Sequence, residues 1–187
     1  MVMTLPNLLT ISRILAIPLI VGTFYIDGLT IRWVACGLFV AAAITDFFDG
    51  YFARRRNSVS SLGRFLDPIA DKLLVSAVLL MLTAFDRVSQ ISVLPAVVIL
   101  LREILVSGLR EYLAELRIGM PVSRLAKWKT GIQMTALPTL LVGSAAPIWL
   151  PAQMLGEICL WGAAVLTLVT GWDYMRAGLK HMNVGVS

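Results

Sequence analysis

The sequence DFFDGYFARRRNSVSSLGRFLDPIAD, residues 46–71, lies between two apolar runs that are each long enough to cross a bilayer. It holds four aspartates, namely Asp46, Asp49, Asp67 and Asp71. Carboxylates are costly in hydrocarbon, so a cluster between membrane-spanning segments needs a cation, a proton or a water-filled cavity. We therefore expect these aspartates to mark a functional site.

The composition predicts an all-α integral membrane protein with a single domain over residues 1–187. Hydrophobic residues make up 58% of the chain and charged residues only 14%. A soluble domain of this length would expose far too much apolar surface. A helix needs about 20 residues to span the hydrocarbon core. Runs of about that length predict six transmembrane helices, at about 8–27, 33–55, 68–86, 91–115, 126–146 and 152–175.

The distribution of Lys and Arg predicts the side of the membrane that the aspartates face. If the N-terminus is cytoplasmic, only Arg32 and Arg87 fall in the opposite links, and Arg102 falls near mid-span. The other basic residues gather on the side of the aspartates, and such an excess is typical of the cytoplasmic side. We therefore expect a polar cavity that faces the cytoplasm. This topology explains the net charge of +5, and no nucleic-acid partner is expected.

Helical spacing places the aspartates on two stripes. The first stripe holds Asp46, Asp49, Gly50, Ala53 and Asn57, and the second holds Gly63, Asp67 and Asp71. If the two stripes face each other, their carboxylates converge and repel, which predicts divalent cations as counter-charge. Oxygen-only ligands favour Mg²⁺, with Mn²⁺ as a substitute. Two such ions could clamp the phosphates of a nucleotide-type substrate.

Some of these residues have a structural interpretation as well. Gly50, Ala53 and Gly63 either leave room for a flat ligand or allow two helices to pack closely. Asp67 precedes Pro68, so it is also a candidate N-cap of a helix that starts at Pro68. Capping does not exclude metal binding. Asp71 lies a full turn inside an apolar run, where capping cannot explain it.

The stretch from Asp46 to Asp71 resembles the signature of the CDP-alcohol phosphotransferases, membrane enzymes that join a CDP-activated lipid or alcohol to a second alcohol. Other stretches of the chain resemble the bacterial phosphatidylglycerophosphate synthases of that family. They are PNLLTISR at 6–13, LREILVSGLRE at 101–111, and KWKT with QM at 127–130 and 133–134. The resemblance implies that CDP-diacylglycerol and sn-glycerol 3-phosphate give phosphatidylglycerophosphate and CMP. It also implies a homodimer among the lipids of a bacterial inner membrane.

The resemblance also implies a role for each matching residue. Asp46, Asp49 and Asp67 would bind two metal ions, and Asp71 would complete the second site and act as the base. A further set of residues would bind the CDP-lipid, and it includes the small residues of the two stripes. This set is Asn7, Thr10, Arg13, Gly50, Ala53, Arg54, Ser60 and Gly63.

The phosphate of the acceptor needs cations of its own. Arg110, Lys127 and Lys129 are the candidates, because they lie near the cytoplasmic ends of the fourth and fifth predicted helices. Arg102 and Glu103 lie near mid-span, and we expect them to form a buried polar pair with neighbouring helices.

Two other functions remain open at this point. The signature specifies the CDP-lipid half of the reaction only, so inositol phosphate, serine or phosphatidylglycerol are alternative acceptors. A cation carrier could also place aspartates in membrane helices, but it would need a second gate and polar residues along the outer half of its path. The links opposite the aspartates offer almost none.

Overall fold

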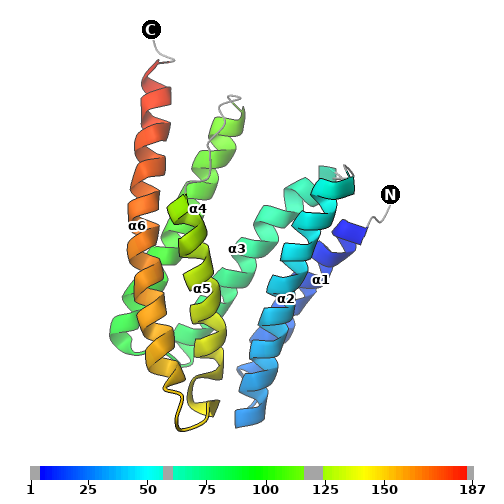
Figure 1. The fold of residues 1–187 in the computed structure, drawn as a ribbon, viewed down its shortest axis with the longest axis vertical. Coiled ribbons are helices and arrows are strands. Elements are labelled where there is room, and N and C mark those ends of the chain that lie inside the picture. The colour runs from blue at the N-terminus through cyan, green and yellow to red at the C-terminus, as the bar shows by residue number, and fades with distance from the viewer. Residues whose placement is uncertain (1–4, 57–60, 116–123, 185–187) are drawn as a thin grey trace.

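The computed structural model describes residues 5–56, 61–115 and 124–184, and these residues form a bundle of helices without a strand. The α-helices are α1 (Leu5–Thr23), α2 (Leu29–Arg56), α3 (Ser61–Ala84), α4 (Val93–Glu115), α5 (Arg124–Val142) and α6 (Ala152–Val184), with short 3-10 turns η1 (Gln90–Ser92) and η2 (Gly143–Ala145). The links 24–28, 85–92 and 143–151 meet at one end, at the bottom of Figure 1. We call this end the basal end. The all-α prediction is confirmed for the described residues.

The outer surface of the bundle is that of a membrane protein. Within the described residues, two segments are long and apolar enough to cross a membrane, at 90–114 and 152–176, and shorter apolar helices cover 9–23 and 29–45. Large apolar side chains such as Leu101, Ile104 and Leu168 point outward and are exposed. Lipid can cover such a surface, whereas water covers it only at a cost. That all six helices span the bilayer remains a prediction.

The start of α3 differs from the prediction. α3 begins at Ser61 and contains Pro68 in its interior, so the interpretation of Asp67 as an N-cap at Pro68 is wrong. An interior proline removes the hydrogen bond to the carbonyl four residues earlier, and its ring crowds that carbonyl, yet the helix continues across Pro68. Polar residues before Pro68 obscured the helical periodicity in the sequence. As a result, Asp67 and Asp71 lie one turn apart on the same helix.

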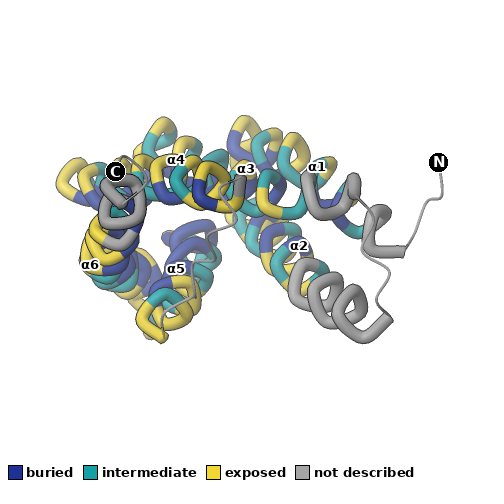
Figure 2. The backbone as a smooth tube through the Cα atoms, turned by 90° about the horizontal axis from the view of Figure 1, so that it is seen from above, coloured by how far each residue is buried: buried dark blue, intermediate teal, exposed yellow. Residues whose placement is uncertain are grey.

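The helices pack in two rows that share one core. α1, α3 and α4 form one row and α2, α5 and α6 the other in Figure 2. α5 packs on α6, α1 on α2 and α3, and α4 on α6, while the α2–α5 and α3–α4 contacts join the halves. Leu79, Ile99 and Leu137 are buried in this shared core. The core therefore holds α3, α4 and α5 in a fixed arrangement.

Polar contacts tie the links together at the basal end. Glu157 of α6 accepts hydrogen bonds from the backbone N–H of Ser89 at 2.9 Å and from the hydroxyls of Ser89 and Ser92 at 2.5 and 2.6 Å. Trp33 Nε1 donates to the carbonyl of Ala145 at 3.2 Å. Gly143, the first residue of η2, follows α5 with a φ of +44°, which glycine adopts without a steric cost.

The close packing of α5 on α6 predicts the effect of enlarging Gly156. A Cβ at this position would lie 2.7 Å from Cγ and 2.8 Å from Cδ2 of Leu140, and 3.3 Å from its backbone nitrogen. Leu140 is fully buried, so it has little space to move aside. We expect Gly156→Ala to lower the free energy of unfolding by about 1–3 kcal/mol, measured by denaturation in detergent.

Gly162→Ala on the same helix is the matched control. The nearest atom to a Cβ at Gly162 is Cγ2 of Ile132 at 4.0 Å, which is ordinary contact. This substitution should leave stability unchanged or raise it by up to about 1 kcal/mol. Equal stability of the two variants would contradict the tight contact between Gly156 and Leu140.

Candidate active site

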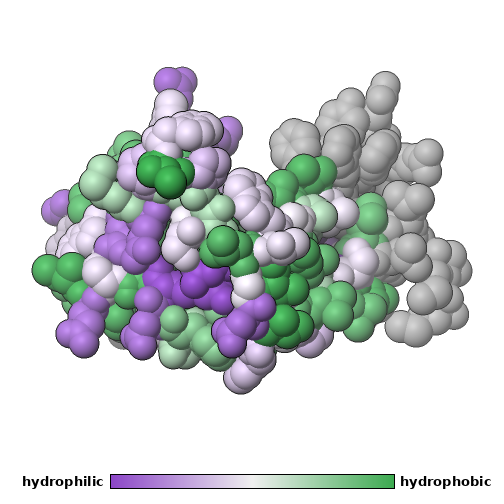
Figure 3. Space-filling view, turned by 90° about the horizontal axis from the view of Figure 1, so that it is seen from below, coloured by the Kyte–Doolittle hydropathy of each residue, from purple (hydrophilic) through white to green (hydrophobic). Residues whose placement is uncertain are grey.

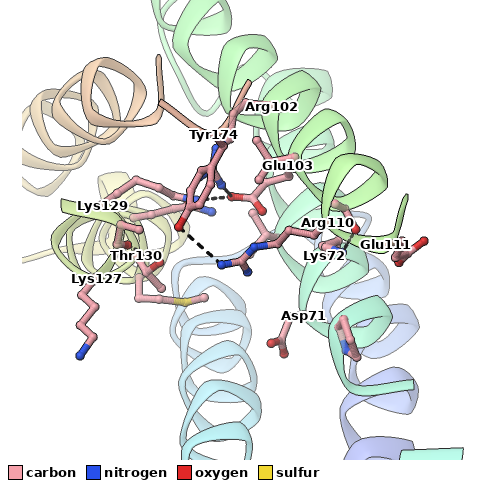
Figure 4. A pocket seen from close by; sticks show the side chains of 18 of the residues that line it. Asp71, Lys72, Arg102, Glu103, Arg110, Glu111, Lys127, Lys129, Thr130 and Tyr174 are labelled. Carbon is pink, nitrogen blue, oxygen red and sulfur yellow. Dashed lines mark hydrogen bonds and ion pairs between the residues drawn. The ribbon is translucent and has the colours of Figure 1, made fainter. Parts of the chain in front are cut away.

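A cavity of about 980 Å³ lies between α3, α4, α5 and α6. Its volume is within the range of small-molecule sites. The polar side chains that line it are Asp71, Lys72, Arg102, Glu103, Ser107, Arg110, Glu111, Lys127, Lys129, Thr130, Gln133 and Tyr174. Figure 4 shows that they come from helices far apart in the sequence.

α1 supplies partners for two carboxylates of α3. Arg13 is buried and donates from NH1 to Oδ1 of Asp71 at 2.7 Å. Thr10, also buried, donates from its hydroxyl to Oδ1 of Asp67 at 2.5 Å. The side chain of Asp71 remains 44% exposed, and this residue borders the cavity. Two residues that the sequence placed at the CDP-lipid thus contact two predicted metal ligands.

Glu103 of α4 organises the charges on the other side of the cavity. Its Oε1 pairs with Nζ of Lys129 from α5 and with NH1 of Arg102, the latter at 3.3 Å. NH2 of Arg102 also reaches the hydroxyl of Thr170 on α6 at 3.4 Å. A buried charge without a partner is strongly destabilising. The predicted polar pair of Arg102 and Glu103 with neighbouring helices is confirmed, but both side chains are half-buried and line the cavity.

Tyr174 of α6 lies between two guanidinium groups. Its hydroxyl accepts a hydrogen bond from NH2 of Arg110 at 3.5 Å. The guanidinium carbons of Arg110 and Arg102 lie 5.2 and 5.8 Å from the centre of its ring, within the range of cation–π attraction. The sequence analysis missed Tyr174, because a single tyrosine near the end of the last apolar run carries no spacing signal.

The three cations predicted for the acceptor phosphate have different surroundings. Lys129 is buried and engaged by Glu103. Lys127 is exposed and points away from Glu103 and Arg110 in Figure 4. Arg110 extends its guanidinium among the labelled side chains of the cavity. Of the three, Arg110 has the orientation that best suits a ligand in the cavity.

Gln133 is a further polar group that the sequence analysis did not single out. It is 2% exposed and lines the cavity. Its Oε1 atom is buried and has no hydrogen-bond partner among the described residues. A buried carbonyl oxygen of this kind is costly unless a donor satisfies it. A ligand hydroxyl in the cavity would be such a donor.

Some of the predicted metal-binding and CDP-lipid-binding residues lie outside the part of the chain whose side chains the structure describes. The side chains of Asn7, Asp46, Asp49, Gly50, Ala53, Arg54 and Gly63, and the whole of Ser60, lie outside the described part of the structure. Among the side chains that are described, no three acidic, histidine or cysteine groups gather. The last turns of α2 and the first turns of α3 do lie together, at the end opposite the basal end (Figure 1). The convergence of all four aspartates stays a prediction.

A family model described as CDP-alcohol phosphatidyltransferase matches residues 3–169. The chain belongs to the CDP-alcohol phosphatidyltransferase family. The resemblance carried by residues 46–71 is thereby confirmed. The match to this phosphatidyltransferase family extends over α1 to α5 and about half of α6. It therefore includes both the carboxylates of α3 and the charged residues of α4 and α5.

Two phosphatidyltransferase relatives match this chain over nearly its whole length. A protein of Rickettsia bellii is 52% identical over 177 residues, which cover 95% of this chain and 96% of the relative. A protein of Rickettsia typhi is 53% identical over 173 residues, which cover 92% and 96%. Both are named CDP-diacylglycerol–glycerol-3-phosphate 3-phosphatidyltransferase.

One relative has a different name. A cardiolipin synthase (CMP-forming) of Oryza sativa subsp. japonica is 42% identical over 164 residues. The match covers 81% of this chain but only 49% of the rice protein. The relatives are thus not uniform in the reaction that their names describe.

Proposed function

We propose that this protein transfers the phosphatidyl group of CDP-diacylglycerol to sn-glycerol 3-phosphate, giving phosphatidylglycerophosphate and CMP. The observation that carries this proposal is the 52% identity, over 95% of the chain, to a relative named for this transfer. The cavity fits the same chemistry, because Asp71 lies on one wall and Arg110 on another. A carboxylate suits the activation of a hydroxyl, and a guanidinium suits the binding of a phosphate.

The donor half of the reaction is proposed to lie at the four aspartates. Asp46, Asp49, Asp67 and Asp71 would hold two Mg²⁺ ions, for which Mn²⁺ could substitute. The described part of this set fits such ions, since Asp67 and Asp71 offer carboxylate oxygens one turn apart on α3. Bound Mg²⁺ would neutralise charge on the diphosphate of the donor.

The remaining contacts to the CDP-lipid are proposed at α1 and at the two stripes of small and polar residues. Thr10 and Arg13 support this location, because they already contact Asp67 and Asp71. The other proposed contacts are Asn7, Gly50, Ala53, Arg54, Ser60 and Gly63. The planar guanidinium of Arg54 suits a phosphate better than a lysine would.

Asp71 is proposed as the base. A glycerol hydroxyl is a poor nucleophile at neutral pH, and a carboxylate within reach can take its proton as the oxygen attacks phosphorus. A new bond then forms between that oxygen and the phosphorus of the phosphatidyl group, and the bond from phosphorus to the oxygen of CMP breaks. Arg13 holds Asp71 at the cavity wall. No covalent intermediate with the protein is needed.

The acceptor phosphate is proposed to bind at Arg110, with Lys127 and Lys129 as further cations. Tyr174 supports this role of Arg110, since its hydroxyl and ring orient the guanidinium toward the cavity. Gln133 would accept a hydrogen bond from a glycerol hydroxyl through the Oε1 atom that has no described partner. The acceptor would then lie between Arg110 and Asp71, both of which line the same cavity.

We further propose that all six helices span the inner membrane of a bacterium, that the cavity opens to the cytoplasm, and that the protein is a homodimer. The uneven distribution of basic residues supports the orientation, because Arg32 and Arg87 alone lie in the links expected on the far side. Membrane lipids would surround the exposed apolar side chains.

The reaction can be tested by measuring CMP release by the purified protein with CDP-diacylglycerol and Mg²⁺. We expect release with sn-glycerol 3-phosphate and none after addition of EDTA. Serine, inositol 1-phosphate and phosphatidylglycerol serve as alternative acceptors, the last because it tests the activity that the rice relative's name suggests. Release with one of these alone would move the chain to another branch of the family. Failure with every acceptor would reopen the cation-carrier hypothesis.

Replacing Asp71 by asparagine tests its role as base. The amide cannot accept the proton, so we expect kcat to fall by about 10²–10⁴-fold, while the protein still binds CDP-diacylglycerol. Steady-state CMP release and equilibrium binding of the donor measure the two effects. Asp86→Asn at the basal end is the control. Asp86 has a φ of 51°, which asparagine tolerates well. Near-normal turnover of Asp71→Asn would exclude Asp71 as the base.

Replacing Arg110 by alanine tests the acceptor site. Loss of a charge-assisted phosphate contact should raise the KM for sn-glycerol 3-phosphate by about 10–100-fold, with little change in the KM for CDP-diacylglycerol. The control is Arg124→Ala, which removes an exposed arginine from the start of α5. An equal rise in both KM values would argue against an acceptor-specific role.

A further inference from the structure

Lys72 of α3 is a cation of the cavity wall that the proposed reaction leaves without a role. It is half-buried and lines the cavity, as does Asp71, the residue before it. Its ammonium group donates a hydrogen bond to the hydroxyl of Ser107 on α4. Ser107 is also half-buried and lines the cavity. This contact therefore brings Lys72 to the side of the cavity that α4 forms.

The contact with Ser107 also brings Lys72 close to Arg110. Ser107 and Arg110 are three residues apart on α4, and the Cβ atoms of residues at this spacing lie about 5–6 Å apart on one side of a helix. Figure 4 shows Lys72 next to the side chain of Arg110, with Lys127 and Lys129 across the cavity. One wall of the cavity thus combines two cations from two helices, α3 and α4.

The charge of Lys72 is not neutralised by a carboxylate. No ion pair between described residues includes Lys72, whereas Lys129 is paired with Glu103. Glu111 of α4 also lines the cavity, but its carboxylate points away from the guanidinium group of Arg110 in Figure 4. Lys72 therefore keeps its positive charge for an anionic ligand.

The polar groups on this wall can all donate hydrogen bonds. An ammonium group has three N–H donors, of which Lys72 directs one at Ser107. The hydroxyl of Ser107 accepts that bond and has its own proton to donate. The guanidinium group of Arg110 has further N–H donors besides the one that reaches Tyr174. A set of donors of this kind suits an anion with several oxygens, such as a phosphate.

We propose that Lys72, held by Ser107, binds the phosphate of the acceptor together with Arg110. This inference rests on the proposed function and adds to it a residue from the helix that carries the base. Asp71 and Lys72 are turned from each other by about 100° around α3. The reacting hydroxyl of sn-glycerol 3-phosphate would lie at the carboxylate, and its phosphate at the ammonium group. Two consecutive residues of α3 would thus orient the acceptor.

Steady-state CMP release by the full-length protein, with each substrate varied in turn, tests the proposal. We expect Lys72→Gln to raise the KM for sn-glycerol 3-phosphate by about 10–100-fold, with little change in the KM for CDP-diacylglycerol. Lys72→Arg keeps the charge and should recover most of this loss. Ser107→Ala should raise the same KM by a smaller factor, because the ammonium group loses the hydroxyl that holds it.

Arg32→Gln is the matched control. Arg32 is a half-buried cation like Lys72, but it lies near the start of α2 at the basal end and does not line the cavity. Figure 3 shows this end from below, with hydrophilic surface in the middle of the face and hydrophobic side chains around it. Both KM values should stay at the wild-type level in this variant.

Calorimetric titration with sodium phosphate measures anion binding without turnover. We expect phosphate to bind the wild type more tightly than Lys72→Gln, and to compete with sn-glycerol 3-phosphate. Absence of CMP release by the wild type would contradict the proposed function, whereas the titration would still show whether Lys72 binds a phosphate.

Three results would overturn the proposal in a wild type that is active. The first is an unchanged KM for sn-glycerol 3-phosphate in Lys72→Gln. The second is a rise in the KM for CDP-diacylglycerol alone, which would assign Lys72 to the donor. The third is an unchanged KM for the acceptor in Ser107→Ala, and this variant keeps the test valid if Lys72→Gln fails to fold.

Discussion

The buried guanidinium of Arg13 and the carboxylate of Asp71 form the contact on which the arrangement of the cavity depends. Arg13 is among the largest fully buried side chains of the protein, and a charge in such a place is tolerated only when it is paired. The 2.7 Å contact joins α1 to α3, and the contact of Thr10 with Asp67 adds a second polar link between these helices. Displacement of α1 would expose the charge of Arg13 to an apolar environment. The position of Asp71 at the cavity wall is thus coupled to the position of α1.

The ion pairs of Glu103 have a similar effect on α4, α5 and α6. Lys129 and Arg102 converge on its carboxylate, and Arg102 reaches Thr170. The cations of this region therefore differ in what they are able to bind. Lys129 is largely neutralised by Glu103, whereas Arg110 is oriented by the neutral side chain of Tyr174 and keeps its charge for a ligand. This difference supports the proposed order of importance among the acceptor residues.

The two ends of the bundle contain different polar groups. The last turns of α2 and the first turns of α3 lie at the end opposite the basal end (Figure 1), and Asp71 of α3 lines the cavity. The basal end contains Glu157, whose carboxylate accepts hydrogen bonds from Ser89 and Ser92.

The sequence by itself determined the helical class, the approximate positions of the helices and the family, because these depend on local periodicity, composition and the spacing of a few residues. It placed the start of α3 too late, since the polar residues before Pro68 do not follow an apolar period. Only the tertiary structure decided that Tyr174 lies beside Arg110, that Lys129 pairs with Glu103, and that Arg13 pairs with Asp71. Each of these contacts joins helices or links far apart in the chain, so it depends on the packing of the whole bundle, which local sequence spacing does not encode.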